Sequence, residues 1–404
     1  MRITMLFCTV VLALVGADAA PLYEASHIFK YDTPNHVHAS SLVELPGGEL
    51  IAVWYENGPE IDDPRYYYER KDKSSDVRLG GARKPSGAAA WSKPFVMADT
   101  FGVSDNNPTM IVDREKRLWL IYPTLLGVPD WTWGSAIVRY RIAKDLSVDG
   151  PPMWAKSDIL VPHPVGLESV LDATAIAWGE QLKKDETYRA RALGYVESIR
   201  EEIKKPLMPR LGWMPRAHPL IRSDGALVLP LSNENANIAM MAITKDGGES
   251  WTYSSPVPEA GLTQPTLVEF EDGQMSAFFR NGSPEKRIKR SDSADGGMTW
   301  SPVTNTDLLH PGAGIEALLL QSGHLLMIYN DVEESPRDKL AVSISEDRGK
   351  TWRWTRHLED IDGGRFDYPS IIQASDGTLH ATYSYNLETI KHVHFNEEWV
   401  QAGD

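Results

Sequence analysis

Short apolar runs separated by tight polar turns recur along most of this chain. Runs such as residues 277–281 and 326–331 begin apolar and end on a polar or charged residue, and they have the length of a buried strand. A small turn with another apolar run on its far side is typical of a β-hairpin. Six such turns occur, at residues 46–50, 113–118, 223–227, 272–275, 322–325 and 376–379. The pattern predicts an all-β protein built from repeated hairpins.

A second repeat has the form Ser/Thr-x-Asp-x-Gly-x-Ser/Thr-Trp. It occurs at residues 244–251, 293–300 and 345–352, with degenerate versions ending at Trp91 and Trp154. The three copies are about 50 residues apart, a period that indicates a solenoid, a propeller or an array. Asp and Gly favour a tight turn between strands, and the Trp packs on the sheet. One period has room for four short strands, which make one propeller blade, so six hairpins predict a six-bladed β-propeller.

One segment departs from the repeat. Residues of about 174–205 are rich in Ala, Glu, Lys and Arg and contain no Pro before residue 206, which predicts helix. The segment falls between the second and third hairpins, so it is a helical insertion between blades 2 and 3. Three interpretations of the insertion stay open: a solvent-exposed surface element, a lid over the site, or a contact between subunits.

The first twenty residues have the pattern of a secretory signal. Arg2 is followed by an apolar run over 5–15 and by the small-x-small sequence Ala17-Asp18-Ala19. We therefore expect a signal peptide over 1–20, cleavage near Ala19 or Ala20, and one propeller domain over 21–404. No later segment is apolar enough to span a bilayer, so we expect an extracellular or periplasmic protein with no membrane anchor.

Composition narrows the chemistry. The single cysteine, Cys8, lies in the predicted signal, so the mature chain has no disulfide, thiol nucleophile or Cys-ligated metal. A net charge of −15 argues against binding to nucleic acid, which needs basic surface. The close histidine pairs at 36 and 38 and at 392 and 394 lack an obvious third ligand. We therefore predict no metal and no other cofactor.

Counting residues from each hairpin turn predicts which side chains lie at the same end of every blade. In each hairpin, the position about nine residues before the turn and the position about seven after it meet at one end of the blade. In a ring of blades this end surrounds the central channel. The upstream positions are His38, Asn107, Arg216 with His218, Gln264, Glu316 and Tyr368. The downstream positions are Glu56, Tyr122, Ser232 with Asn233, Arg280, Asn330 with Asp331, and Ser384 with Tyr385. This polar ring either lines a wet channel or performs chemistry, and its His, Arg, Glu and Tyr favour chemistry.

With its three Asp-containing repeats, the chain resembles the sialidase (neuraminidase) superfamily of Asp-box, or BNR-repeat, proteins over essentially everything after the signal. Members bind the substrate carboxylate with three arginines and attack with a tyrosine. The resemblance implies that Arg280 and Arg337 are the second and third of these arginines. It implies that Tyr368, in Tyr-Pro-Ser-Ile, is the nucleophile.

The resemblance also implies roles for carboxyl groups. Glu316 is placed to polarise Tyr368, and Asp62 or Asp63 falls where the family has its acid/base. The chain departs from the family at two positions. His38 replaces the first arginine, and Gln264 stands where the family has a catalytic glutamate. Arg216 is positioned to compensate as a carboxylate ligand.

The leading hypothesis is a secreted, retaining glycoside hydrolase that releases a terminal acidic sugar from a glycan or polysaccharide. The expected catalytic residues are Tyr368, Glu316, Asp62 and Asp63. The expected substrate-binding residues are His38, Asn107, Trp131, Arg216, Gln264, Arg280 and Arg337, with Trp133 beside Trp131 as a sugar platform.

Two alternatives stay open. A polysaccharide lyase acting on uronic acids would use His38, Tyr368 and Arg280. A propeller that binds glycans without catalysis would keep its affinity when Tyr368 is changed. No feature of the sequence specifies an oligomeric state.

Overall fold

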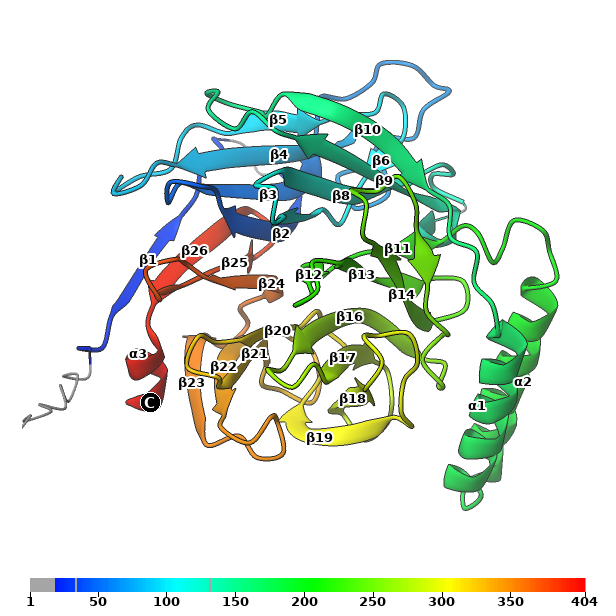
Figure 1. Ribbon diagram of the computed structural model, residues 1–404. Helices are drawn as coiled ribbons and strands as arrows, with labels where there is room; N and C mark the ends of the chain where they lie inside the picture. The colour runs from blue at the N-terminus through cyan, green and yellow to red at the C-terminus, as the bar shows by residue number, and fades with distance from the viewer. Residues whose placement is uncertain (1–18, 33–34, 131, 404) are drawn as a thin grey trace, which may run out of the picture.

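The computed structural model describes residues 19–32, 35–130 and 132–403. Its strands form six antiparallel sheets, and these stand as blades around a central axis (Figure 1). The predicted six-bladed β-propeller, with a helical insertion between blades 2 and 3, is therefore confirmed. Most of the predicted signal, residues 1–18, lies outside the described residues.

Each blade is a run of neighbouring strands. Blade 1 contains β2 (Val37–Glu44), β3 (Leu50–Asn57), β4 (Val77–Lys84) and β5 (Phe95–Ala98). Blade 2 contains β6 (Ser104–Asp105), β7 (Thr109–Val112), β8 (Leu118–Leu125), β9 (Ala136–Ala143) and β10 (Trp154–Leu160). Blade 3 contains β11 (Trp213–Met214), β12 (Leu220–Ile221), β13 (Leu227–Asn233), β14 (Ile238–Thr244) and β15 (Thr252–Tyr253).

The second half of the ring is built in the same way. Blade 4 contains β16 (Leu262–Glu269), β17 (Met275–Asn281), β18 (Arg287–Ser293) and β19 (Thr304–Leu309). Blade 5 contains β20 (Glu316–Leu319), β21 (Leu325–Asn330), β22 (Lys339–Ser345) and β23 (Trp354–Asp360). Blade 6 contains β24 (Phe366–Gln373), β25 (Leu379–Tyr385), β26 (Thr389–Phe395) and, as its outer strand, β1 (Tyr23–His27).

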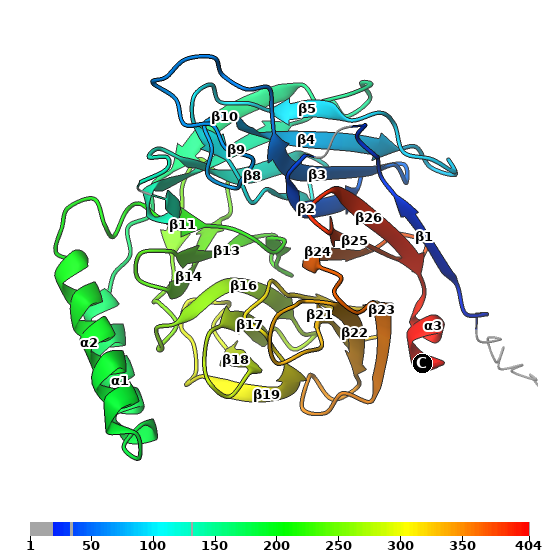
Figure 2. The ribbon, with the colours of Figure 1, turned by 180° about the vertical axis from the view of Figure 1, so that it is seen from behind.

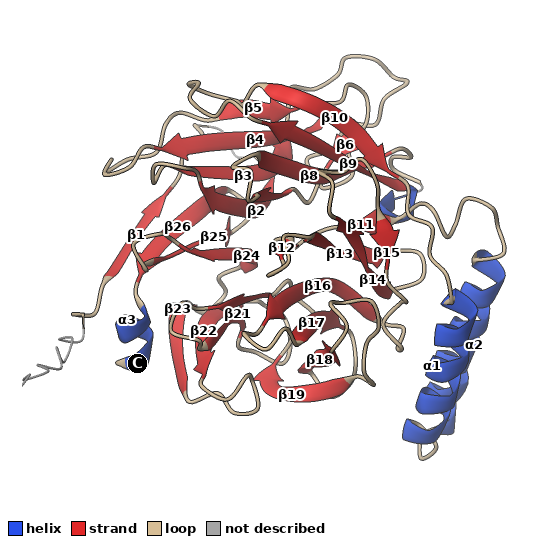
Figure 3. Cartoon of the chain, viewed as in Figure 1, coloured by secondary structure: helices blue, strands red, loops and turns tan. Residues whose placement is uncertain are grey.

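The two ends of the described chain meet in blade 6. Strand β1 pairs antiparallel with β26 from Tyr23 opposite Phe395 to His27 opposite Lys391. Figure 3 shows this N-terminal strand along the outer edge of the last sheet. A strand from the start of the chain therefore completes a blade made by its end and closes the ring.

The hydrophobic core is divided among the blade interfaces. Every residue of β3, β8, β13 and β14 is buried, because each strand is covered on both faces by neighbouring blades. The repeat tryptophans join these interfaces. The Trp251 ring packs edge-on against Trp119 and Tyr140 of the preceding blade, with ring centroids 6.4 Å and 5.9 Å away.

The repeated turns hold themselves together. Asp246 Oδ1 accepts hydrogen bonds from the backbone N–H groups of Glu249 and Ser250 over 3.1 and 3.0 Å. The Ser250 hydroxyl donates to its other oxygen. Gly248 is left-handed, with φ +81°, and a Cβ there would lie 3.0 Å from the Trp119 ring. Asp295 and Asp347 make the same contacts in the other two turns, which explains the Ser/Thr, Asp and Gly of the repeat.

The insertion is a pair of helices rather than one segment. Helix α1 (Leu167–Gln181) starts earlier than the predicted 174, because Leu167, Val170, Leu171 and Thr174 form a buried stripe at helical spacing. Helix α2 (Glu186–Glu202) begins where the Asp185 side chain accepts from Tyr188 N–H. The pair stands beside β14 at the outside of the ring in both views (Figure 1, Figure 2).

Two short helical elements complete the described chain, the 3₁₀ turn η1 (Thr132–Ser135) and the C-terminal helix α3 (Glu397–Gln401). Within the described ranges, none of the helices has the length and apolar character needed to cross a membrane.

Candidate active site

A cavity of about 710 Å³ opens at one end of the central channel. Of the predicted site residues, the structure brings six to its wall: His38, Asn107, Gln264, Arg280, Arg337 and Tyr368. Arg216, Glu316, Asp62 and Asp63 do not line it. Trp131 lies outside the described residues, but its neighbour Trp133 lines the cavity.

Tyr368 lines the cavity from the first half of β24. Its hydroxyl accepts hydrogen bonds from Arg280 Nη1 at 2.9 Å and from Gln264 Nε2 at 3.4 Å. The His38 ring stands edge-on to the Tyr368 ring, with centroids 4.5 Å apart. Residues from blades 1, 4 and 6 therefore converge on one phenol.

A shared backbone feature aims these side chains. Asn107, Gln264 and Tyr368 all have left-handed φ, of 35°, 49° and 51°, and Ala39 beside His38 has φ 50°. Strands β2, β16 and β24 each have a bulge at this point. Left-handed backbone costs an L-residue about 1–2 kcal/mol, and such strain gathers at functional sites. The four positions occur near the start of an inner strand. This explains why counting back a fixed number of residues from each hairpin turn identified them.

Arg216 lies behind Tyr368 rather than in the cavity. Its side chain is 1 % exposed, its guanidinium is 5.0 Å from the centroid of the Tyr368 ring, and its Nη2 donates to Pro369 O over 2.6 Å. Burial lowers the pKa of Arg216, but the charge of nearby Glu316 opposes this shift. Arg216 therefore packs against the Tyr368 ring, and the residue expected to bind the substrate carboxylate does not line the cavity.

Glu316 is also committed to structure. Its Oε1 accepts from the backbone N–H and the Nδ1 of His218, both at 2.7 Å. Its Oε2 accepts from Ile371 N–H at 3.0 Å. Burial alone would raise the pKa of Glu316, but His218 and Arg216 outweigh it and lower that pKa. With both oxygens occupied away from the Tyr368 hydroxyl, Glu316 does not have the contact expected of a base for that phenol.

The acidic loop of blade 1 supplies a different aspartate from the two expected. Asp63 forms an ion pair with Arg65 at 2.5 Å on the surface, and Asp62 also lies away from the cavity. Asp72, later in the same loop, lines the cavity, accepts from Tyr55 Oη at 2.9 Å and contacts His36 Nε2. Burial would raise its pKa, but the hydrogen bond with His36 and the charges of His38 and His36 lower it to about 2.

Two further residues of the cavity were not foreseen. Arg365 precedes β24, and its Nε donates to Asp367, the residue that also accepts from Arg337 Nη1 at 2.6 Å. Asp367 is fully buried, so it fixes both guanidinium groups. Three arginines, Arg280, Arg337 and Arg365, therefore share the cavity. Arg365 stands three residues before Tyr368, and this proximity is the only signal for it in the sequence.

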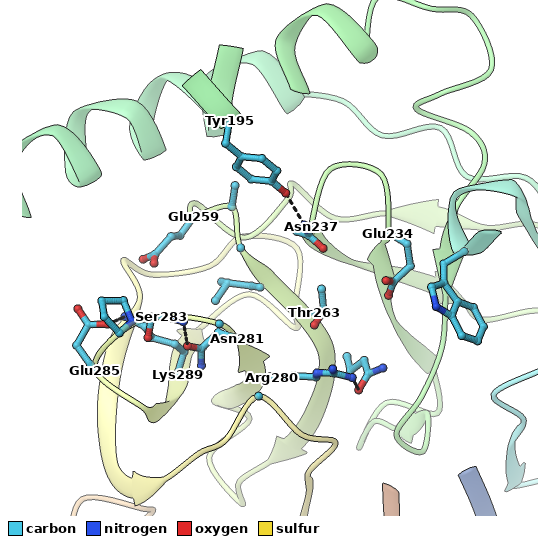
Figure 4. A pocket seen from close by; sticks show the side chains of 18 of the residues that line it. Tyr195, Glu234, Asn237, Glu259, Thr263, Arg280, Asn281, Ser283, Glu285 and Lys289 are labelled. Carbon is cyan, nitrogen blue, oxygen red and sulfur yellow. Dashed lines mark hydrogen bonds and ion pairs between the residues drawn. The ribbon is translucent and has the colours of Figure 1, made fainter. Parts of the chain in front are cut away.

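Glu234 is the second residue that lines the cavity without having been predicted from the sequence. It follows β13 and points toward the guanidinium of Arg280 (Figure 4). Burial raises its pKa, while the charge of Arg280 acts in the opposite direction. Two of the carboxyl groups that line the cavity therefore have opposite pKa shifts, an ionised Asp72 and a Glu234 that retains its proton to higher pH. Such a divided pair is a mark of acid/base chemistry.

Histidines near the site are not arranged for a metal. Burial is the main cause that lowers the pKa of His38 to about 4, and its Nδ1 is 2.9 Å from the Ser384 hydroxyl. Among the residues that the structure describes, no group of three or more His, Cys, Asp or Glu side chains is placed to hold a metal ion.

Comparisons with known proteins identify relatives of this chain. Residues 200–381 match the BNR repeat-like domain. A sialidase of Micromonospora viridifaciens is 24 % identical over 385 residues, which cover 91 % of this chain and 52 % of the relative. A sialidase of Paraclostridium sordellii is 26 % identical over 206 residues, 46 % of this chain and 50 % of the relative. The chain thus spans about half the length of these curated relatives.

Solved structures share the fold. The NanB sialidase of Streptococcus pneumoniae superposes with a TM-score of 0.65 at 12 % identity, covering 93 % of this chain and 71 % of that one. A protein of unknown function from Dyadobacter fermentans superposes with a TM-score of 0.66 at 16 % identity, covering 92 % of this chain and 98 % of that one. Identities this low establish the architecture of the ring and leave its chemistry to the residues of the cavity.

Proposed function

Because the chain belongs to the sialidase superfamily of BNR-repeat proteins, we propose that it is a glycosidase that releases a terminal acidic sugar from a glycan. The observation that carries the proposal is the Tyr368 hydroxyl, held by Arg280 in a cavity shared with Arg337 and Arg365. A guanidinium matches the geometry of a carboxylate, so this cluster suits a sugar acid. Arg365 supplies the third guanidinium that His38 does not.

The proposed reaction proceeds in two steps with retention. The phenol oxygen of Tyr368 attacks the anomeric carbon, and the bond from that carbon to the leaving oxygen breaks. Glu234 gives its proton to the leaving oxygen, and the phenol proton passes through a water molecule to the ionised Asp72 on the same cavity wall. Water then attacks the same carbon, Glu234 takes a proton from that water, and Asp72 returns its proton to Tyr368. A neutral phenol suits this attack because a carboxylate would be repelled by the substrate acid.

The first test is an assay of the mature protein on terminal sialosides and on uronic-acid glycans. The proposal expects a free acidic sugar and a new reducing end on the glycan. Absence of turnover on every terminal acidic glycoside would overturn it, and glycan affinity without turnover would instead identify a binding propeller.

A lyase is the second candidate, favoured by one observation. The Tyr368 hydroxyl contacts Arg280 and Gln264 rather than a carboxylate, and the low pKa of His38 makes this neighbouring imidazole neutral at ordinary pH. In this alternative the neutral His38 imidazole removes the proton next to an arginine-bound uronate carboxylate, and the Tyr368 hydroxyl gives its proton to the leaving oxygen. The glycosidic bond then breaks by elimination, and the product gains a carbon–carbon double bond. Ultraviolet absorption by the product separates this outcome from hydrolysis.

We also propose that the catalytic unit is the propeller over 21–404 and that it acts after export, with residues 1–20 removed. Expression in a secreting host followed by N-terminal sequencing tests both statements. The expected mature N-terminus is Ala20 or Pro21, and a cell-retained protein that still begins at Met1 would contradict export.

A further inference from the structure

The cavity continues outward from the arginines to the helical hairpin α1–α2. We propose that this outer half is a second subsite, built by the hairpin and the facing edge of blade 4, for an uncharged sugar that carries the acidic one. The inference rests on the proposed function and narrows it. The substrate class becomes an acidic sugar joined to a neutral glycan, in preference to a chain of acidic sugars.

The hairpin is a fixed wall rather than a loose flap. Thr174 Oγ1 accepts from Ala260 N–H at 2.9 Å, and the Tyr195 hydroxyl is hydrogen-bonded to Asn237 (Figure 4). Leu171 and Val196 are completely buried in a cluster that includes residues of blades 3 and 4. Contacts of this kind hold the helices at a constant distance from the propeller, so their side chains can define a binding surface.

Close approach of α1 to blade 4 depends on one glycine. Gly261 has φ +86°, and a Cβ at this position would lie 3.3 Å from the Trp178 ring. The Trp178 indole also hydrogen-bonds to the Glu259 carboxylate. Trp178 and Tyr195 stack on each other with centroids 6.5 Å apart and an angle of 18°. This pair forms a rigid aromatic corner at the outer end of the cavity.

The lining of this corner fits a sugar. Tyr188 lines the cavity and is 41 % exposed, so its ring is available to a ligand. Gln181, Asn237 and Ser283 add uncharged hydrogen-bonding groups nearby. An amphipathic aromatic ring beside amide and hydroxyl groups suits a ligand with one apolar face and many hydroxyls. The cavity volume of about 710 Å³ lies well within the range of about 300–1,000 Å³ for ligands larger than one small ring.

Charge separates the two halves. The inner half has three arginines beside the carboxyl groups of Asp72 and Glu234, whereas the outer half has Glu259 and Glu285 beside the single ammonium of Lys289. The Lys289 side chain is 8 % exposed and its Nζ is 4.0 Å from Glu285 Oε2. A second carboxylate on the ligand would meet net negative charge at this end. Attraction of a carboxylate at the inner end and repulsion of a carboxylate at the outer end together select a substrate whose terminal sugar is acidic and whose next sugar is uncharged.

The test compares two substrates in the full-length mature protein. One is 3′-sialyllactose, which has a neutral disaccharide after the acidic sugar, and the other is an aryl sialoside, which has none. The variant Tyr188→Ala is expected to raise KM for sialyllactose by about tenfold and to leave the aryl sialoside unchanged. Ile176→Ala is the matched control, because Ile176 is on the same hairpin, is 72 % exposed and does not line the cavity. Equal effects on both substrates would overturn the subsite.

A second measurement addresses charge. Glu285→Gln is expected to raise kcat/KM for an α2,8-linked disialoside several-fold relative to sialyllactose, and an unchanged ratio would overturn the electrostatic selection. If no sialoside is turned over, titration with lactose alone still tests the subsite. The total tryptophan fluorescence, to which Trp178 contributes, is expected to respond to lactose in the wild type and in Tyr368→Phe, and to lose the response in Tyr188→Ala. No response in the wild type would overturn the subsite separately from the catalytic proposal.

Discussion

The guanidinium of Arg280 donates a hydrogen bond to the hydroxyl of Tyr368 over 2.9 Å. The contact joins the end of a strand in blade 4 to the start of a strand in blade 6. It places the positive charge of the guanidinium beside the oxygen proposed as nucleophile. This charge stabilises the negative charge that the oxygen bears when the phenol loses its proton. The two residues are 88 positions apart in the chain, and the ring of blades brings them together.

Removing that oxygen is the most direct test of the nucleophile. Tyr368→Phe is expected to lower kcat by at least about 10³-fold, while substrate affinity stays within a few-fold because the arginines are intact. Isothermal titration with a sialoside measures the affinity. Tyr253→Phe is the control, since Tyr253 is half-buried in blade 3 and does not line the cavity. Wild-type turnover by Tyr368→Phe would exclude the assigned role.

Glu234 is expected to act through its proton. Glu234→Gln should lower kcat by about 10²-fold on natural glycosides, and should have little effect on aryl glycosides whose leaving group needs no proton. Rates on the two leaving groups measure the difference. Asp63→Asn, at the surface, is the control and should change neither rate.

The pH profile provides an independent check of Glu234. Burial raises its pKa, and the protonated form is the active acid, so activity on natural glycosides is lost as the pH rises through that pKa. Asp72, with a pKa of about 2, stays ionised until the pH approaches that value. In Glu234→Gln the alkaline decline should disappear, and a decline that persists unchanged would assign it to another group.

Arg365 is expected to contribute to binding. Arg365→Ala removes one charge-assisted contact to the substrate acid, worth about 1.5–3 kcal/mol, so KM should rise by about 10–100-fold. Steady-state kinetics on a sialoside measure the change. Arg353→Ala is the matched control, because Arg353 is paired with Glu346 on the surface away from the cavity. Equal KM values for the two variants would remove Arg365 from the carboxylate site.

The buried pair of Glu316 and His218 is expected to affect stability. Leaving His218 buried without its partner should lower the free energy of unfolding of Glu316→Gln by about 3 kcal/mol. Urea denaturation measures this change. Glu201→Gln, which breaks a surface pair with Lys204, should cost less than about 1 kcal/mol.

The same pair predicts a pH window. The folded pKa of His218 is raised above 6.5, so its contribution is complete below 6.5 and is lost as the pH rises through the folded value. The folded pKa of Glu316 is lowered below 4.5, so its contribution is complete above 4.5 and is lost as the pH falls through the folded value. The difference between wild type and Glu316→Gln should therefore be largest between about pH 4.5 and 6.5, and a difference that grows at pH 9 would contradict the assignment.

Residues placed by strand register could be predicted from the sequence. Six hairpins and three repeated turns specify the blades, and counting from each turn located His38, Gln264, Arg280 and Tyr368 in the cavity. This succeeds because side chains repeat regularly along a paired strand, and because the same bulge recurs at the start of several inner strands.

Residues whose position or role depends on a loop or on a neighbouring blade could not be predicted from the sequence. Asp72 and Asp63 share one loop between β3 and β4, and only the folded path of that loop shows which of them reaches the cavity. Glu316 lies at the start of an inner strand, as its distance from the turn predicts. Its contacts, however, depend on His218 from another blade. The fold of a loop and the partner across a blade interface are set by long-range packing, which has no periodic signal in the chain.

The closure of blade 6 by β1 has a consequence for how the protein is made. Strand β1 precedes the other strands in the chain, but its partner β26 follows all six hairpins. Contacts so distant in sequence form slowly, and until they form the ring has two open sheet edges. Tyr368 belongs to that last blade, so a nascent chain can possess five blades and still lack the cavity. Catalytic competence and ring closure should therefore appear together, as one late event in folding.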